Sequence, residues 1–214
     1  TGPRADATSR LSVAASGGTQ SGFNGGRVSE EIVRRRMAAI LAADIAGYSR
    51  LMGEDDVATF RDLKGHQAAI FPLVGEHGGR IIDTAGDGIM AEFPSAIGAV
   101  ECALQLQSVM ESRNVGVPQN RRMEFRIGIN IGNVIHDEVR IYGDGINIAA
   151  RLENVAQPGG ICLSEDAYRE VRDRLTVPAH DLGERELKNI AKRVRAYALL
   201  KVPVGENRTD NFHH

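Results

Sequence analysis

The sequence predicts an α+β fold in which helices pack on one face of a mixed β-sheet. Short apolar runs typical of strands alternate with amphipathic stretches typical of helices, and the alternation has no regular repeat. Several strand pairs are close enough along the chain to form hairpins, which join antiparallel strands. With 214 residues, of which 42% are hydrophobic, the chain is long enough for one substantial core and short for two ordinary domains.

The two ends of the chain differ in composition from the middle. Residues 1–28 are rich in Gly, Ser, Thr and Ala, and we expect a flexible leader there because such a stretch buries little apolar surface. Residues 29–36 are expected to form a short helix or linker with Ser29 as its N-cap. Residues 203–214 are polar and are expected to be a disordered tail. The folded domain is therefore predicted at 37–202.

Charge and cysteine content argue against several classes of protein. The formal net charge is −2 and no basic stripe is present, so nothing indicates binding to nucleic acid or to an anionic membrane. No apolar run is long enough to span a bilayer and no signal-peptide core is visible, so we expect a cytoplasmic fragment without membrane contact. Cys102 and Cys162 lack metal-type spacing and are expected to be buried free thiols.

The folded part is predicted to begin with a strand that is followed directly by an aspartate. Residues 37–43 are apolar and are followed directly by Asp44, as in a buried strand with a site residue at its carboxyl end. Residues 54–74 then carry apolar side chains at helical spacing, beginning with Val57 and Phe60, and a Gly-Gly pair ends the predicted helix. This helix is expected to cover the sheet.

A second acid lies between two short predicted strands. Residues 80–84 and 89–93 flank Asp87, which stands between two glycines, and this pattern predicts a tight hairpin. Taken alone, Asp44 can be a helix cap and Asp87 an ordinary turn residue. If their strands are neighbours, however, the two carboxylates converge and repel each other unless a cation lies between them. Mg²⁺ favours such sites, with substrate phosphates as further ligands.

The remaining elements follow from the same patterns. A helix is expected at 143–156, stopped by the Pro-Gly-Gly run that begins at Pro158. Its residues Asn147 and Arg151, four apart, project from one helix face where they can bind one ligand. The structural alternative is that Arg151 pairs with Glu153 or Asp144. The predicted segments are a helix at 96–114, a strand at 125–131, a turn at Gly132-Asn133 with a hairpin partner at 134–141, a helix at 143–156, a strand at 161–163, a helix from 165 and a strand at 194–200.

Four segments together resemble a known family. LAADIAGYSRLM, DTAGDGIMAEF, FRIGINIGNVI and IYGDGINIAARLE are similar to the catalytic domain of class III adenylate and guanylate cyclases, with the bacterial, rhizobial-type members the most similar. The resemblance covers residues 37–200 in order. It implies a ferredoxin-like sheet of mixed or antiparallel strands with helices packed on it, and a head-to-tail homodimer whose active sites lie between the subunits.

The resemblance also implies roles for the candidate residues. Asp44 and Asp87, with the Ile45 carbonyl, are expected to hold two Mg²⁺ or Mn²⁺ ions per active site. Asn147 is expected to orient the ribose and Arg151 to donate to the α-phosphate, both from the partner subunit. The implied reaction converts a nucleoside triphosphate into its 3′,5′-cyclic monophosphate and pyrophosphate.

Three further positions concern substrate binding. Lys188 matches a family lysine that contacts the terminal phosphates. Adenylate cyclases of this class usually read adenine with a lysine at one position and an aspartate or threonine at another. At these positions the chain has Asp83 and Arg140 instead, so the negative and positive charges are exchanged. These residues are compatible with ATP, which the motif spellings favour, with GTP, and with UTP or CTP, and they can also pair with each other. A non-catalytic nucleotide-binding regulatory module is the alternative to an enzyme.

Overall fold

The computed structural model describes residues 34–136 and 141–199. The leader predicted at 1–28, most of the segment 29–36 and the tail predicted at 203–214 lie outside the described residues. The strands are β1 (Arg34–Ile45), β2 (Arg80–Asp83), β3 (Ile89–Phe93), β4 (Phe125–His136), β5 (Ile141–Tyr142), β6 (Ile161–Ser164), β7 (Ala179–Arg185) and β8 (Val194–Leu199). The helices are α1 (Tyr48–Glu54), α2 (Asp56–Glu76), α3 (Ala96–Arg113), α4 (Asp144–Val155) and α5 (Glu165–Val171), with 3₁₀ turns at Gln119–Arg121 and Arg172–Arg174.

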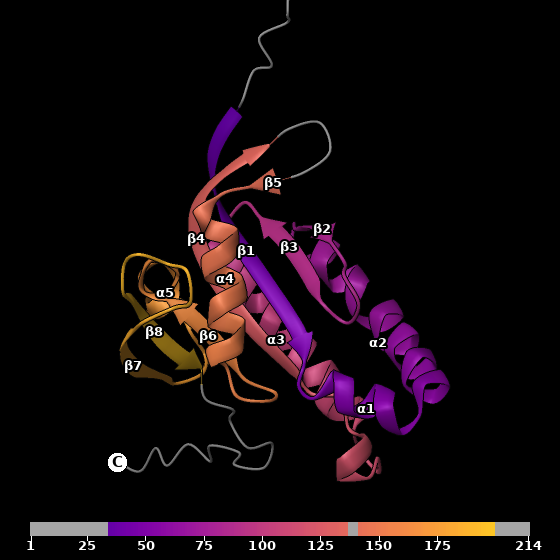
Figure 1. Cartoon of the computed structure of the whole chain (residues 1–214). Coiled ribbons are helices and arrows are strands. Elements are labelled where there is room, and N and C mark those ends of the chain that lie inside the picture. Colours follow the sequence, from indigo (N-terminus) through magenta and orange to yellow (C-terminus); the bar gives the residue numbers. More distant parts are fainter. Residues whose placement is uncertain (1–33, 137–140, 200–214) are drawn as a thin grey trace, which may run out of the picture. The chain divides into compact units, whose positions relative to one another are not determined.

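The described strands form one mixed sheet, as predicted (Figure 1). Its order is β2-β3-β1-β4-β6-β8-β7, and the short β5 pairs with β4. β4 and β6 are parallel, whereas the other pairs are antiparallel. The strand that carries Asp44 is therefore central and is hydrogen-bonded on both sides.

Helices cover both faces of the sheet, so the prediction that they pack on one face is wrong. Along β1, Ala39, Leu41 and Ala43 belong to the larger core, together with residues of α2 and α3. The alternate residue Ala38 belongs to a second cluster with Ala149 of α4. Successive side chains of a strand point to opposite faces, so α4 lies across the sheet from α2 and α3. Figure 1 shows α4 in front of the strands and α3 behind them.

Glycines allow α4 to lie directly against β4. A Cβ atom at Gly128 would be 2.2 Å from the carbonyl oxygen of Ala149 and 2.2 Å from the amide nitrogen of Glu153. At Gly132, a Cβ atom would be 2.8 Å from the Cα atom of Gly145 in α4. Any side chain at these positions would push the helix away from the strand.

The same packing explains one wrong prediction. β4 runs without a break from Phe125 to His136, so there is no turn at Gly132-Asn133 and residues 134–136 continue the strand. Gly132 allows α4 to pack closely against β4 and does not form a turn. The hairpin partner of β4 is the shorter strand β5, which pairs with Ile135 and His136.

Three other predictions need correction. Residues 34–36, expected in a short helix or linker, begin β1 and pair with β4. The α2 helix is present and ends before Gly78-Gly79, but Val57 and Phe60 are 75% and 53% exposed, so they do not face the core. β7 was not among the predicted strands. Its alternation of apolar and polar residues is weak, because most of its side chains are exposed or half-buried.

A buried carboxylate ties the beginning of β1 to its neighbours. Glu92 of β3 is 3% exposed, and it forms ion pairs with Arg36 of β1 and Arg80 of β2. A buried charge is stable only when it is paired in this way. The three strands β1, β2 and β3 are therefore fixed to one another at this end of the sheet.

Both cysteines are buried free thiols, as predicted. Burial raises the pKa of Cys102 and of Cys162 to about 12, which leaves the thiols protonated and unreactive at neutral pH. Among the described helices, none is both long enough and apolar enough to cross a bilayer.

His66 of α2 is buried against α3. Its Nδ1 atom accepts a hydrogen bond from Nε of Arg113 at 2.8 Å, which requires an unprotonated Nδ1. Burial lowers the pKa of His66 below its ordinary value of 6.5, and the charge of Arg113 lowers it further. The folded protein therefore favours neutral His66.

We expect this histidine to make the fold sensitive to acid. Below about pH 6.5 the unfolded chain binds a proton that the folded protein resists, so the contribution of His66 is present above that pH and is lost as the pH falls through the lower pKa of the folded state. His66→Asn keeps an acceptor near the place of Nδ1 and should lose less stability between about pH 7 and pH 5.5. Urea unfolding at several pH values measures this, and equal losses in both proteins would contradict it.

Candidate active site

Asp44 lies at the carboxyl end of the buried strand β1, where the sequence predicted it. Its register partner on β4 is Arg126. The Arg126 guanidinium donates from Nε to Oδ1 of Asp44 at 2.9 Å and from Nη2 to Oδ2 at 2.5 Å. Both side chains are 25% exposed, so the pair is partly shielded from water. Arg126 was not among the residues predicted from the sequence.

Asp87 lies on the tight loop between β2 and β3. Gly86 has a φ angle of 63°, and the amide of Gly88 donates to the carbonyl of Ala85 at 2.9 Å, which closes the predicted turn. The Oδ2 atom of Asp87 accepts a hydrogen bond from the main-chain amide of Ile45 at 2.9 Å. The structure thus brings Asp87 beside the end of β1, next to Asp44, as the pairing of these strands predicted.

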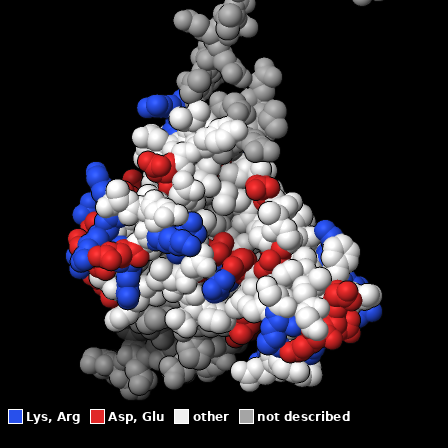
Figure 2. Space-filling view, viewed as in Figure 1, with Lys and Arg blue, Asp and Glu red and all other residues white. Residues whose placement is uncertain are grey.

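The two aspartates belong to a cluster of four charged groups. Burial raises the pKa of Asp87, and the nearby charge of Asp44 raises it further, while the amide of Ile45 acts in the opposite direction. Burial and the charge of Asp44 raise the pKa of Glu153, on α4, to about 8. Arg126 is the cation that interacts with all three carboxyl groups. In Figure 2, acidic groups with a basic neighbour gather in the middle of the viewed face, where β1 ends.

This cluster fits a divalent cation that is partly coordinated by substrate. Asp44, Asp87 and the carbonyl of Ile45 offer the hard oxygen atoms that Mg²⁺ and Mn²⁺ prefer. Within residues 34–136 and 141–199, no group of three or more His, Cys, Asp or Glu side chains is arranged to hold a metal ion alone. Two protein carboxylates with phosphate oxygens as further ligands is the usual arrangement for Mg²⁺. The donor set at the end of β1 matches it.

Asn147, Arg151 and Lys188 form a second group of predicted site residues. Asn147 is exposed on α4. The Nε atom of Arg151 donates to the carbonyl oxygen of Lys188 at 3.1 Å. Arg151 is therefore not committed to Glu153 or Asp144, and its guanidinium lies beside the loop that carries Lys188. The structure thus places the side chain of Arg151, the predicted α-phosphate ligand, beside the backbone of Lys188, the predicted terminal-phosphate ligand.

Within one chain, α4 separates this second group from the aspartates. Residues two apart on an α-helix point about 200° apart around its axis. Glu153 interacts with Asp44, whereas Arg151 contacts Lys188. The aspartates and the phosphate-binding candidates therefore lie on different sides of the same helix.

The predicted base-reading residues are only partly described. Asp83 is the last residue of β2, is exposed, and stands opposite Met90 of β3, next to the loop of Asp87. Arg140 lies outside the described residues. Sequence reasoning did not identify Arg126 or Glu153. The one available signal for Arg126 is a charged residue between the apolar residues Phe125 and Ile127 at the start of a predicted strand.

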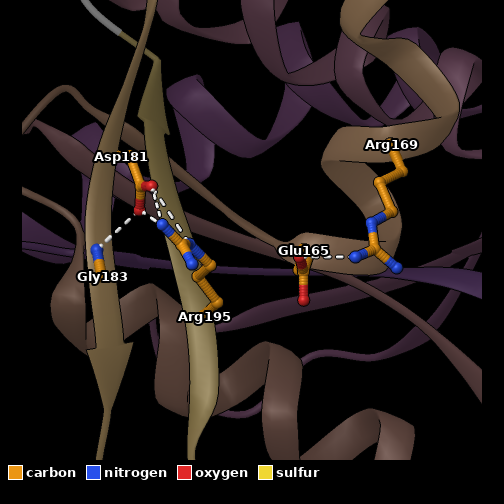
Figure 3. A network of polar contacts seen from close by, with 5 residues as sticks. All are labelled: Glu165, Arg169, Asp181, Gly183 and Arg195. Carbon is orange, nitrogen blue, oxygen red and sulfur yellow. Dashed lines mark hydrogen bonds and ion pairs between the residues drawn. The ribbon is translucent and has the colours of Figure 1, made fainter.

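Another bidentate pair shows what an ordinary surface ion pair looks like in this fold. Asp181 of β7 accepts from Arg195 of β8 at 3.0 Å and from the amide of Gly183 at 2.7 Å (Figure 3). Asp181 and Arg195 are 39% and 46% exposed, and water screens such a pair strongly. The Asp44–Arg126 pair differs because it is less exposed and lies close to two further carboxyl groups.

Comparison with known proteins gives a consistent family. The family described as "Adenylate and Guanylate cyclase catalytic domain" matches residues 31–201. A protein of Rhizobium meliloti (strain 1021) named "Putative adenylate cyclase 3" is 42% identical over 171 residues, which are 79% of this chain and 29% of that protein. An adenylate cyclase of Streptomyces coelicolor is 31% identical over 144 residues, or 66% of this chain and 35% of that protein. The chain thus spans about a third of the length of these relatives.

A solved structure confirms the fold. The adenylate/guanylate cyclase/hydrolase of Silicibacter pomeroyi superposes with a TM-score of 0.75 and 39% sequence identity. The match covers 79% of this chain and 99% of that one. The sheet, its helices and the family match agree over the same residues, and the chain belongs to the adenylate and guanylate cyclase catalytic domain family.

Proposed function

We propose that the chain is a nucleotidyl cyclase that converts a nucleoside triphosphate, with ATP preferred, into its 3′,5′-cyclic monophosphate and pyrophosphate. The observation that carries the proposal is the convergence of Asp44 and Asp87 at the end of β1, where the Ile45 amide holds Asp87 at 2.9 Å. Paired carboxylates of this kind bind the cations used in phosphoryl transfer. The names of the Rhizobium and Streptomyces relatives support ATP, although the family name covers adenylate and guanylate cyclases.

Each predicted site residue has a separate role in an in-line displacement at the α-phosphorus. Asp44, Asp87 and the Ile45 carbonyl would hold two Mg²⁺ or Mn²⁺ ions, which when bound lower the pKa of the ribose 3′-hydroxyl and neutralise the triphosphate. Asn147 orients the ribose so that its 3′-oxygen forms a bond to the α-phosphorus while the bond to pyrophosphate breaks. Arg151 stabilises the charge that develops on the α-phosphate.

We propose further that two copies of the chain complete each site. Lys188 and Arg151 lie together across α4 from Asp44, so one chain cannot present both groups to the same triphosphate without rebuilding the helix. The main strand contacts of α4 in the described part of the chain are with β4, β1 and β6, and β2 is not among them. A head-to-tail homodimer would place Asn147, Arg151 and Lys188 of one copy over the aspartates of the other.

Removing the charge of Asp87 tests the enzyme assignment. Asp87→Asn keeps the size of the side chain and an acceptor for the Ile45 amide, and we expect turnover to fall by about a hundredfold or more because the cations lose a charged ligand. The matched control is Asp181→Asn, which neutralises an exposed aspartate. The measurement is cyclic product and pyrophosphate from each of ATP, GTP, UTP and CTP with Mn²⁺. If wild type gives no product from any of them, the alternative of a non-catalytic nucleotide-binding module replaces the proposal.

Mixing two inactive variants tests the shared site. In a head-to-tail dimer of Asp87→Asn with Arg151→Ala, one site contains both defects and the other contains neither. An equimolar mixture that re-equilibrates should recover about a quarter of wild-type activity, because half of the dimers are mixed and each has one intact site. If the mixture stays as inactive as its components, the residues do not act across a dimer.

Replacing Asp83 tests base recognition. Asp83→Ala removes the acceptor expected to read the base and leaves the aspartates at the end of β1 in place. We expect the ratio of kcat/KM for ATP over GTP to change by about tenfold, with turnover of the better substrate largely retained. Steady-state kinetics with all four triphosphates measures this, and an unchanged ratio would mean that Asp83 does not read the base.

A further inference from the structure

A turn between β7 and β8 contains a residue in a rare backbone conformation. Among the non-glycine residues that the structure describes, Asn189 alone has a positive φ angle, 64°. Most side chains clash with the backbone in this left-handed region, and asparagine is one of the few that adopt it regularly. Asn189 directly follows Lys188, the predicted terminal-phosphate ligand. The rare conformation therefore occurs beside the proposed triphosphate site.

The positive φ angle determines the direction of the Lys188 carbonyl. The amide of Ile190 donates to the carbonyl oxygen of Leu187 at 3.0 Å, which closes a four-residue turn with Lys188 and Asn189 at its centre. Of these two central residues, Asn189 alone has a positive φ angle, which is the pattern of a type II turn. Types I and II differ by a rotation of the central peptide of roughly half a turn. A negative φ angle at Asn189 would therefore point the Lys188 carbonyl in another direction.

The ends of this turn are fixed by packing, whereas its centre is exposed. Leu187 is 6% exposed and belongs to the core cluster that contains Leu152 of α4, and Ile190 packs against the same cluster. Lys188 and Asn189 are exposed. Because exposed side chains have few packing contacts, the conformation at the centre of the turn depends on which φ angles residue 189 can adopt.

The Lys188 carbonyl holds the predicted α-phosphate ligand. The Nε atom of Arg151 donates to it at 3.1 Å. This contact uses one of the five N–H groups of the guanidinium, so the two terminal nitrogen atoms keep their donors for a ligand. A guanidinium that is held at Nε has less rotational freedom, and its terminal donors are oriented before a substrate binds. Such preorganised donors are the ones that stabilise charge in a transition state.

We propose that Asn189 is a positioning residue for the cyclase reaction. Its left-handed conformation directs the Lys188 carbonyl toward Nε of Arg151, and this carbonyl holds the Arg151 guanidinium in the orientation that serves the α-phosphate. The inference rests on the proposed function, in which Arg151 stabilises the charge that develops on that phosphate. In this role Asn189 acts through the backbone of Lys188 and contacts no substrate itself.

Two substitutions of Asn189 separate the backbone conformation from the side chain. Asn189→Gly removes the amide but allows a positive φ angle, and we expect kcat within about twofold of wild type. Asn189→Val disfavours a positive φ angle because valine is β-branched. Its kcat should fall about tenfold while KM changes less than about threefold, since Arg151 acts mainly in the transition state. Steady-state kinetics with Mn²⁺ and the triphosphate that wild type prefers measures both constants.

An arginine variant tests whether the effect passes through Arg151. Arg151→Lys keeps a positive charge but has all its donors on one nitrogen, so a carbonyl cannot hold it from the side as it holds a guanidinium. In this background Asn189→Val should lower kcat by less than about twofold, because the group that Asn189 positions is gone.

Nuclear magnetic resonance tests the contact without relying on activity. The ¹⁵N-labelled Nε–H group of Arg151 is assigned by its absence from Arg151→Lys. Because hydrogen bonding slows exchange with water, this group should exchange at least about fivefold faster in Asn189→Val than in wild type. Asn189→Gly should exchange at close to the wild-type rate.

Two controls accompany these variants. Asn120→Val makes the same substitution at an exposed asparagine whose φ angle is not positive, and it should leave kcat within about twofold of wild type. Circular dichroism verifies folding of each protein. If Asn189→Val does not fold, Asn189→Ala replaces it, with a smaller loss of kcat expected in the same direction.

Each contrary outcome overturns a different step. Equal kcat losses in Asn189→Gly and Asn189→Val would show that the asparagine side chain matters and the backbone conformation does not. Wild-type kcat in Asn189→Val, or a loss that Asn120→Val reproduces, overturns the positioning role. An undiminished effect in Arg151→Lys, or an unchanged exchange rate of the Arg151 Nε–H group, overturns the route through Arg151. If wild type forms no cyclic product from any triphosphate, the proposed function fails as well, whereas failure of the inference alone leaves wild-type turnover intact.

Discussion

The close contact between α4 and β4 is the constraint on which the rest of the site depends. Gly128 and Gly132 have no side chain to separate the helix from the strand, and a Cβ atom at Gly128 would meet the helix backbone at 2.2 Å. Because of this contact, one short helix brings Glu153 to the Asp44 pair on one side and Arg151 to the Lys188 loop on the other. A few tenths of an ångström of added separation would weaken both contacts at once, since packed interiors have little free volume.

The charges at the end of β1 are balanced in a way that differs from the rest of the surface. Elsewhere, as at Asp181 and Arg195, an exposed pair neutralises itself and water screens what remains. At the end of β1, Asp44, Asp87 and Glu153 interact with one arginine in a partly buried setting. Such an excess of carboxyl groups costs stability in the absence of a cation. Such a cluster is the pattern expected where function competes with stability.

The sequence predicted the elements that are encoded locally. The run before Asp44, the Gly-Asp-Gly turn at Asp87 and the helix carrying Asn147 and Arg151 each have their own signal in neighbouring residues. The position of Asp87 beside Asp44 followed only on the assumption that their strands are neighbours, which the register of β1 with β3 confirms. The roles of these residues in catalysis remain proposals.

What the sequence could not show depends on contacts between distant segments. The Gly132-Asn133 pair has the composition of a turn, and only the approach of α4 shows why a strand needs glycine there. Helical periodicity placed Val57 and Phe60 on the apolar face of α2, but the buried face runs through Thr59 and Leu63, and Val57 and Phe60 are exposed. Arg126 is opposite Asp44 only through the register of two strands 82 positions apart.

The anchoring of Glu92 has a mechanical consequence for the aspartates. β1 is a continuous strand of 12 residues, with Arg36 near one end and Asp44 near the other. It is hydrogen-bonded to β4 along its whole length and to β3 over residues 39–43, and Arg36 forms an ion pair with Glu92. Slippage by one residue would turn every side chain to the wrong face. A force applied at the amino-terminal end of β1 should therefore move the sheet as a rigid body. Asp44 and Asp87 then move together, and the distance between them is preserved.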